Sequence, residues 1–141
     1  MINYRSQHIE PRLDRVPIST IAEHTKFWTI DCYFKTPVFG DKADQYQPEY
    51  RKWIEDSLPP HVRTCHIQAI IPKSCLKPGS VIGKQDDLAE VLEILPKTTK
   101  FCVSLPAKGQ ESIYMRMNVF GRPLAEKGIC TILLQIPFYG V

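Results

Sequence analysis

The stretch from Lys100 to Val141 contains one strand, crossover and strand, and this unit most constrains the fold. The run Phe101 to Leu105 is rich in β-forming residues, and Ile129 to Pro137 is a longer run of the same kind. Near-continuous apolar runs are typical of strands that are covered on both faces, as in a parallel sheet. Because parallel neighbours need a crossover between them, these residues predict a parallel βαβ unit in an α/β fold.

The residues between the two runs predict the crossover helix. Apolar side chains recur there at intervals of three and four: Ile113, Met117, Phe120, Leu124 and Ala125. Ser112 is a suitable N-cap, and Gly128 stands where a glycine commonly ends a helix. Gly121 and Pro123 interrupt the pattern. Because a proline inside a helix removes a hydrogen bond and clashes with the preceding turn, we expect a kink or two short helices.

Two upstream segments predict an antiparallel pair of strands. Phe27 to Phe34 is dense in aromatic and β-branched residues, and Val62 to Ile71 places its apolar residues at alternate positions. The second segment is therefore a half-buried strand that can pair with the first. Short helices are predicted over Pro48 to Ser57 and over Asp86 to Leu95.

We expect the chain to divide at residue 26. A length of 141 residues fits one domain with a single core. Residues 1–26 are polar and broken by Pro11 and Pro17, with at most a helical turn between Ser19 and His24. They are predicted to be a leader or a loosely ordered segment, and residues 27–141 are predicted to form the α/β domain.

The composition argues against several classes of protein. The net charge of +3 is small and the basic residues are scattered, so no nucleic-acid partner is expected. No apolar run approaches the roughly 18 residues that cross a bilayer, so no transmembrane segment is expected. The five cysteines are widely spaced, with no C-x-x-C and no secretory signal before them. A reducing, intracellular compartment is therefore favoured over a disulfide framework.

No catalytic residue, metal site or cofactor is assigned within the chain. Gly79 to Gln85 differs from a phosphate loop, because it has one residue too few between the glycines and no Ser or Thr after the lysine. A zinc site of Cys65, Cys75 and a histidine is an alternative, although no ligand pair has the usual short spacing. A core cysteine at Cys65 beside a surface histidine at His66 is the favoured interpretation. The nucleophile motif G-x-S-x-G occurs nowhere.

The turn that leaves the first strand of the βαβ unit is the candidate functional site. In open α/β sheets the ligand crevice lies beyond the carboxyl ends of the parallel strands, where this turn would stand. Backbone N–H groups of Ala107, Lys108 and Gly109, near a helix N-terminus, can stabilise an anion or a developing oxyanion. A glycine-bearing turn is also what any βαβ unit needs, so the alternative is a purely structural turn. Two residues after the second strand are predicted to line the same crevice: Phe138 and Tyr139.

Three segments near the C-terminus carry a resemblance to a known family: Leu105 to Gln110 with the following Tyr114 to Arg116, Gly121 to Ile129, and Leu133 to Gly140. They resemble the α/β-hydrolase domain-containing protein 18 family, in which a strand leads into a G-T-G-D-H-like turn and a later strand ends in L-L-L-E-N-P-[FY]-Y-G. The similarity covers roughly residues 27–141. This chain keeps one glycine of the turn and loses its acid and its histidine.

The resemblance implies the N-terminal portion of an α/β-hydrolase fold, with an antiparallel strand pair followed by the βαβ unit. It further implies serine hydrolysis of lipid esters, with mitochondrial phospholipid, cardiolipin in particular, as the suggested substrate. The nucleophile elbow, acid and histidine that follow in such hydrolases have no counterpart here. We therefore expect a chain that is truncated before the elbow and inactive alone. The alternative is a non-enzymatic interaction module that self-associates through an exposed sheet edge.

Overall fold

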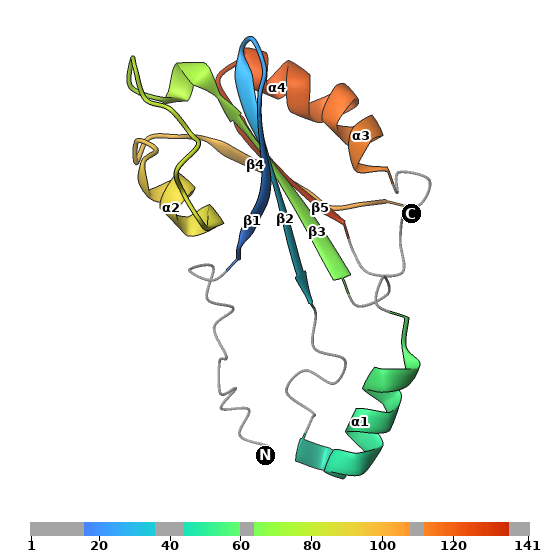
Figure 1. Ribbon diagram of the computed structural model, residues 1–141. Helices are drawn as coiled ribbons and strands as arrows, with labels where there is room; N and C mark the ends of the chain where they lie inside the picture. The colour runs from blue at the N-terminus through green and yellow to red at the C-terminus, as the bar shows by residue number, and fades with distance from the viewer. Residues whose placement is uncertain (1–15, 36–43, 60–63, 108–111, 136–141) are drawn as a thin grey trace, which may run out of the picture.

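The computed structural model describes residues 16–35, 44–59, 64–107 and 112–135, and its centre is a mixed sheet (Figure 1). The strands are β1 (Ile18–Glu23), β2 (Phe27–Lys35), β3 (Thr64–Pro72), β4 (Phe101–Ser104) and β5 (Cys130–Gln135). Their order is β1-β2-β3-β5-β4. The first three strands and β5 are antiparallel neighbours, whereas β4 is parallel to β5. The predicted antiparallel pair and parallel βαβ unit are therefore confirmed.

Helical segments fill the connections between the strands. They are α1 (Pro48–Ser57), the 3-10 turn η4 (Lys73–Cys75), α2 (Leu88–Glu93), α3 (Ile113–Arg116), the π-helical turn η5 (Met117–Gly121) and α4 (Arg122–Glu126). The side chain of Asp87 caps α2 by accepting from the Glu90 N–H at 3.0 Å. Among the described residues, no helix is long and apolar enough to cross a membrane.

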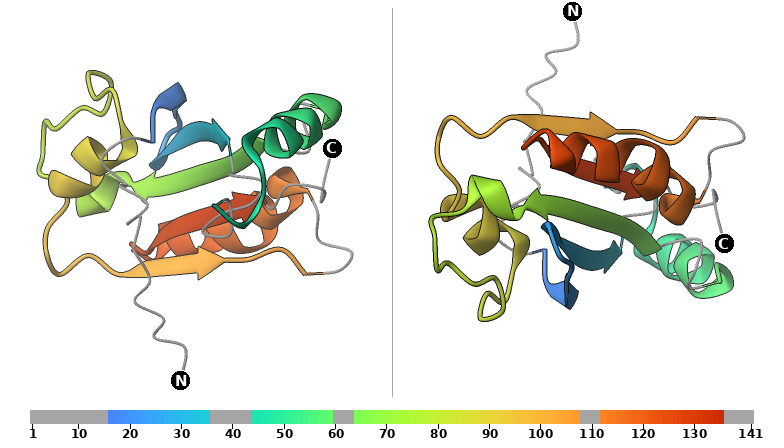
Figure 2. Two further views of the ribbon diagram at one scale, coloured as in Figure 1. Left: turned by 90° about the horizontal axis from the view of Figure 1, so that it is seen from below. Right: turned by 90° about the horizontal axis from the view of Figure 1, so that it is seen from above.

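Alternate strand residues point to opposite faces of the sheet, so the molecule has two cores. On one face Ile30 and Ala69 pack with Leu88 and Val91 of α2. The other core joins strand residues to the crossover helices: Phe27, Ile70, Ile113, Met117, Ala125 and Leu133. Figure 2 shows α2 and the α3–α4 helices at separate sides of the strands. The sheet is thus covered on both faces, as an α/β fold requires.

The crossover helix is interrupted where the sequence predicts. Ser112 caps α3, since its hydroxyl accepts from the Met115 N–H at 3.4 Å. The π-helical turn η5 then separates α3 from α4, and Pro123 falls in the first turn of α4, where a missing N–H does little harm. Gly128 follows α4 with φ of 74°, a left-handed conformation that favours glycine. The expected interruption takes the form of a π-helical turn between two short α-helices, and the expected helix end at Gly128 is confirmed.

Gly121 is required by close packing of the crossover on β3. A methyl group added to it would collide with Cδ1 of Ile70, which is completely buried. We expect Gly121→Ala to lower the free energy of unfolding by about 1–3 kcal/mol, measured by urea denaturation. Gly83→Ala is the control, because the nearest atom to its new methyl is 3.9 Å away, and it should change stability by less than about 0.5 kcal/mol. A more stable Gly121→Ala protein would contradict the prediction.

The N-terminal segment differs from its prediction. The helical turn expected between Ser19 and His24 is wrong, because Ile18–Glu23 is a strand that pairs with β2, with Ile21 opposite Ile30. The edge of β2 supplies backbone partners that local sequence cannot reveal, and tertiary pairing overrides local preference. The leader predicted over residues 1–26 therefore includes one strand of the sheet. Residues 1–15 lie outside the described ranges, and the boundary itself stays a prediction.

Strand β4 also differs from its prediction, because it lies at the edge of the sheet rather than between covering layers. Its side chains alternate, and Phe101 and Val103 are 45% and 62% exposed. Among the described residues the parallel edge of the sheet is β4, since β5 lies between β3 and β4. A short apolar run cannot by itself tell an edge strand from a central one.

Candidate functional site

The carboxyl ends of β4 and β5 meet at one edge of the sheet. The two strands are in parallel register, with Ser104 opposite Leu133. The chain leaves β4 through an exposed Leu105 and reaches an exposed Ala107 before α3 begins. Of the predicted oxyanion residues, Ala107 therefore stands at this edge, whereas Lys108 and Gly109 lie outside the described residues. The predicted crevice-lining residues, Phe138 and Tyr139, also lie outside them.

Arg116 joins the two strand ends to the crossover helix. One Nη donates to the carbonyl of Ser104 at 3.0 Å, and the other donates to the carbonyl of Leu134 at 2.8 Å. Its side chain is completely buried. A guanidinium holds its donors in a rigid fork, so one side chain fixes the last residues of β4 and β5 relative to α3. The turn through Ala107 starts from this fixed point.

The charge of Arg116 has no carboxylate partner among the described residues. The ion pairs there are His66–Asp31 and Lys73–Glu23, and the Nε of Arg116 has no hydrogen-bond acceptor. Burial lowers the pKa of Arg116, because removal from water disfavours the charged form. The two strand-end carbonyls supply the partial negative charge that offsets this cost. A cation that has no ion pair among the described residues still makes this end of the sheet electrostatically suited to an anionic group.

From the sequence, Arg116 is named only as part of a segment that resembles the family, and no role is predicted for its side chain. Its position already indicated an inward side chain, because it falls three residues after Ile113, on the apolar stripe of the helix. A long cationic residue on that stripe predicts a buried hydrogen-bonded guanidinium. The partners could not be predicted, because they are main-chain carbonyls of two strands far apart in sequence.

A second polar cluster lies on strands β2 and β3. His66 Nε2 is 2.7 Å from Asp31 Oδ1, and the Gln68 amide donates to the same oxygen at 3.0 Å. The ring of Tyr33 stacks on His66 at 4.4 Å between centroids. Burial, and then the charge of Asp31, raise the pKa of Tyr33. His66 is therefore a half-buried, hydrogen-bonded residue, and the prediction of a surface histidine is wrong, whereas Cys65 is buried as expected.

The position of this cluster follows from strand register. His66 lies opposite Gln135 and Gln68 lies opposite Leu133, so both are beside the carboxyl-terminal half of β5. Leu133 packs in the core under α3, which places the cluster on the same face as the crossover helix. Sequence reasoning missed it. The available indication was Asp31, a carboxylate inside an otherwise apolar and aromatic strand, which requires a nearby donor when it is partly buried.

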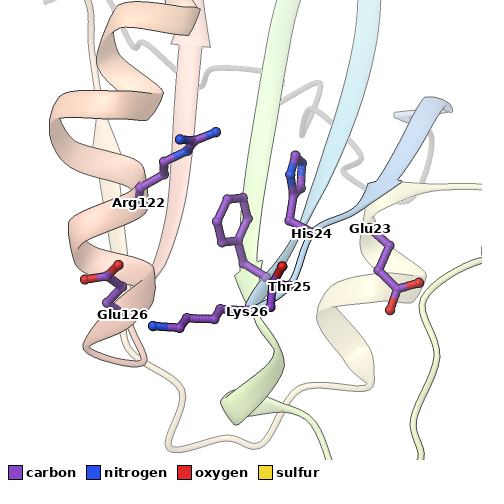
Figure 3. Close-up of a pocket in the computed structure, with 7 residues that line it drawn as sticks. Glu23, His24, Thr25, Lys26, Arg122 and Glu126 are labelled. Carbon is purple, nitrogen blue, oxygen red and sulfur yellow. The ribbon is translucent and has the colours of Figure 1, made fainter.

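The groove drawn in Figure 3 lies at the opposite end of the sheet. It has a volume of about 540 Å³ and is formed by the β1–β2 turn and by α4. Lys26 extends toward the side of the groove that carries Glu126, and Arg122 comes from the same helix as Glu126 (Figure 3). The β1–β2 turn adjoins the first residue of β2, so the groove is near the amino ends of β4 and β5. It is therefore not the predicted crevice.

The zinc alternative is contradicted by the positions of its proposed ligands. Cys65 is near the start of β3 and donates to the carbonyl of Gln135 at 2.9 Å, whereas Cys75 follows the other end of β3 and donates to Gly128 at 3.2 Å. Within the described ranges, no three His, Cys, Asp or Glu side chains are grouped to hold a metal ion. A strand's length separates the two thiols, which sequence spacing alone did not exclude.

The mixed sheet and the helices on its two faces define an α/β protein. A family model described as "Alpha/beta hydrolase domain containing 18" matches residues 3–141. The chain therefore belongs to the α/β-hydrolase domain-containing protein 18 family, as the sequence resemblance indicated. It matches no curated protein and no solved structure.

Proposed function

We propose that this chain supplies the oxyanion-stabilising side of a serine ester hydrolase that acts on lipid esters. Membership of the hydrolase family supports the reaction class. The observation that carries the proposal is the junction at the carboxyl ends of β4 and β5, where Arg116 ties both strands to the helix that follows the turn. Preorganised donors at such a turn are what an oxyanion hole requires.

The proposed chemistry uses backbone groups of the turn. When a serine attacks an ester carbonyl, the carbonyl oxygen gains negative charge, and N–H groups from Ala107, Lys108 and Gly109 would donate to it. Such donors act only if they are held in place before the reaction. The hydrogen bonds from Arg116 restrict the starting point of the turn, and the Ser112 cap restricts the start of α3 at its other end.

The motif G-x-S-x-G is absent from this sequence. The nucleophilic serine would therefore be supplied by a further strand that is added to the sheet. The free edge of β4 supports this part of the proposal. Among the described residues, β4 pairs only with β5, and its outward backbone groups can accept another parallel strand. A strand added there would end beside the turn at Ala107, which is where a nucleophile elbow must stand to use the same oxyanion site.

Exposed apolar side chains support a lipid substrate. Leu105 is 61% exposed at the start of the turn, and Tyr114 and Met115 are 70% and 40% exposed on α3. Leu105 precedes the proposed oxyanion turn in the chain, and the two helix residues follow it. Apolar surface that remains in contact with water favours an acyl chain over a polar substrate. The family suggestion of a mitochondrial phospholipid, cardiolipin in particular, agrees with this surface and is part of the proposal.

A fluorophosphonate probe for reactive serines tests the proposal. We expect the purified 141-residue chain to remain unlabelled, because it lacks the elbow motif. We expect labelling of the protein captured from its source cells with an antibody against Asp41 to Trp53, together with an intact mass above 16.2 kDa. A known serine hydrolase serves as the positive control. Serine labelling of the purified chain would contradict the first expectation.

The second candidate function is a non-enzymatic interaction module, and the exposed edge strand β4 favours it. Phe101 and Val103 present apolar side chains beside unpaired backbone groups, a combination that promotes association with another strand. The same capture experiment separates the two functions. A captured protein of 16.2 kDa that the probe does not label would overturn the hydrolase proposal and favour the interaction module.

A further inference from the structure

Two free thiols meet at the amino end of β5, on the face of the sheet that α2 covers. Cys75 is the last residue of η4, and Cys130 is the first residue of β5. Cys75 Sγ donates to the carbonyl of Gly128 at 3.2 Å, and Gly128 lies two residues before Cys130, so the Cys75 side chain stands beside the start of β5. Cys130 belongs to the apolar core on this face, Cys75 packs against the same core, and neither is in a disulfide.

The backbone around the two thiols is closely packed. Gly128 adopts φ of 74° in the turn between α4 and β5, and a side chain at this position would lie 3.5 Å from Ser74 Oγ. The η4 turn is therefore seated directly against the turn that leads into β5. This packing, together with the Cys75 hydrogen bond to Gly128, brings Cys75 next to the residues that lead into Cys130, although the two cysteines are far apart in sequence.

We propose that Cys75 and Cys130 are a redox-active pair that a low-molecular-weight disulfide converts into an intramolecular disulfide. Cys75 is only partly buried and is the thiol that solvent reaches, whereas Cys130 is completely buried. In the first step the Cys75 thiolate attacks one sulfur of glutathione disulfide. A mixed disulfide forms, and one glutathione thiolate leaves.

In the second step Cys130 resolves the mixed disulfide. Its thiol loses a proton to the departing glutathione thiolate and attacks Cys75 Sγ, and the second glutathione leaves. The protein loses two electrons and two protons, and glutathione disulfide becomes two glutathione thiols. Burial, then the charge of Cys75 and their hydrogen bond, raise the pKa of Cys130 to about 12, which supports Cys75 as the first thiol to react.

The new bond would connect the exit of β3 to the start of β5. The closed loop contains α2, β4, the proposed oxyanion turn and the crossover helices. Because a cross-link restricts the unfolded chain, the oxidised protein should unfold at a higher temperature than the reduced protein. The pair lies at the opposite end of β5 from the proposed crevice, so this inference does not depend on the proposed hydrolase activity.

The test is oxidation of the native chain with glutathione disulfide, followed by alkylation and non-reducing peptide mapping. We expect two of the five thiols to disappear, one Cys75–Cys130 cross-linked peptide and a mass loss of about 2 Da. Cys130→Ala should instead accumulate the glutathione adduct on Cys75. Cys75→Ser should form neither product, and Cys102→Ser, which removes a thiol from edge strand β4, should form the cross-link as the natural chain does.

Three results would overturn the inference. The first is a folded natural chain that keeps all five thiols at a glutathione disulfide concentration that modifies a free surface cysteine. The second is a cross-link between any other pair of cysteines, and the third is a stable glutathione adduct on Cys75 without a cross-link. Peptide mapping of the natural chain decides between these results and the expected one even if a variant fails to fold. Circular dichroism before oxidation establishes that each variant has the native fold.

Discussion

Replacing Ala107 by proline is expected to lower the turnover number for an ester substrate by about 10²–10³-fold. Proline has no backbone N–H, so the variant lacks one proposed donor to the oxyanion, and loss of one such donor costs roughly this factor in other hydrolases. The measurement is the steady-state hydrolysis of a short-chain nitrophenyl ester. It is made with the protein in the form that its source cells express and that the serine probe labels.

Ala107→Ser is the matched control for this experiment, because it keeps the N–H at an exposed position. Its turnover number should stay within about twofold of the natural protein, since no donor is lost. Probe labelling of the proline variant distinguishes loss of the oxyanion donor from loss of the fold. An unchanged turnover number in Ala107→Pro would exclude Ala107 as a donor to the oxyanion. It would not contradict the hydrolase proposal itself, which the serine-probe experiment tests.

Arg116→Ala is expected to lower the free energy of unfolding by about 3 kcal/mol. The change removes the hydrogen bonds to the carbonyls of Ser104 and Leu134 and leaves a cavity in a completely buried site. Urea denaturation followed by circular dichroism measures the loss. Arg116→Lys should recover only a small part of it, because a single ammonium cannot reproduce the two-pronged geometry of the guanidinium.

Arg122→Ala is the control for the loss of an arginine from the same helical segment. Arg122 is exposed in α4 and has no ion pair among the described residues, so its removal should change the free energy of unfolding by less than about 0.5 kcal/mol. If Arg116→Ala lowered the free energy of unfolding by no more than this control, the hydrogen bonds of the guanidinium would not stabilise the strand ends. The structural support for a preorganised turn would then be lost.

The two predictions examine the same edge of the sheet from different sides. Ala107 concerns a donor that would meet the substrate, whereas Arg116 concerns the framework from which that donor is positioned. A residue that only positions the turn should lower the turnover number more than it changes the Michaelis constant in the active protein. Arg116→Lys is the better variant for that comparison, since it keeps a cation in the buried site.

Much of the fold was predictable because its main unit is local in sequence. The crossover lies between two strand segments with clear helical spacing, its cap at Ser112 and its end at Gly128 are residues with specific backbone roles, and proline marks the interruption. These are interactions within a few residues. They are largely independent of the rest of the molecule, and the structure confirms the cap at Ser112 and the helix end at Gly128.

Pairings between distant segments could not be predicted in the same way. A one-residue shift in strand register would move Asp31 away from His66, and nothing within either strand determines that register alone. The edge position of β4 depends on where β5 inserts in the sheet. The thiol pair at Cys75 and Cys130 depends on a turn after β3 packing against another turn after α4.

By itself, the sequence determined the α/β class, the βαβ unit and the hydrolase family, because periodicity, caps and contiguous motifs depend on neighbouring residues. Only the tertiary structure decided which strand is the edge, what the buried guanidinium of Arg116 binds and which two thiols meet. Those features arise from burial and from contacts between segments far apart in the chain. Their free energies exist only when the whole sheet is assembled.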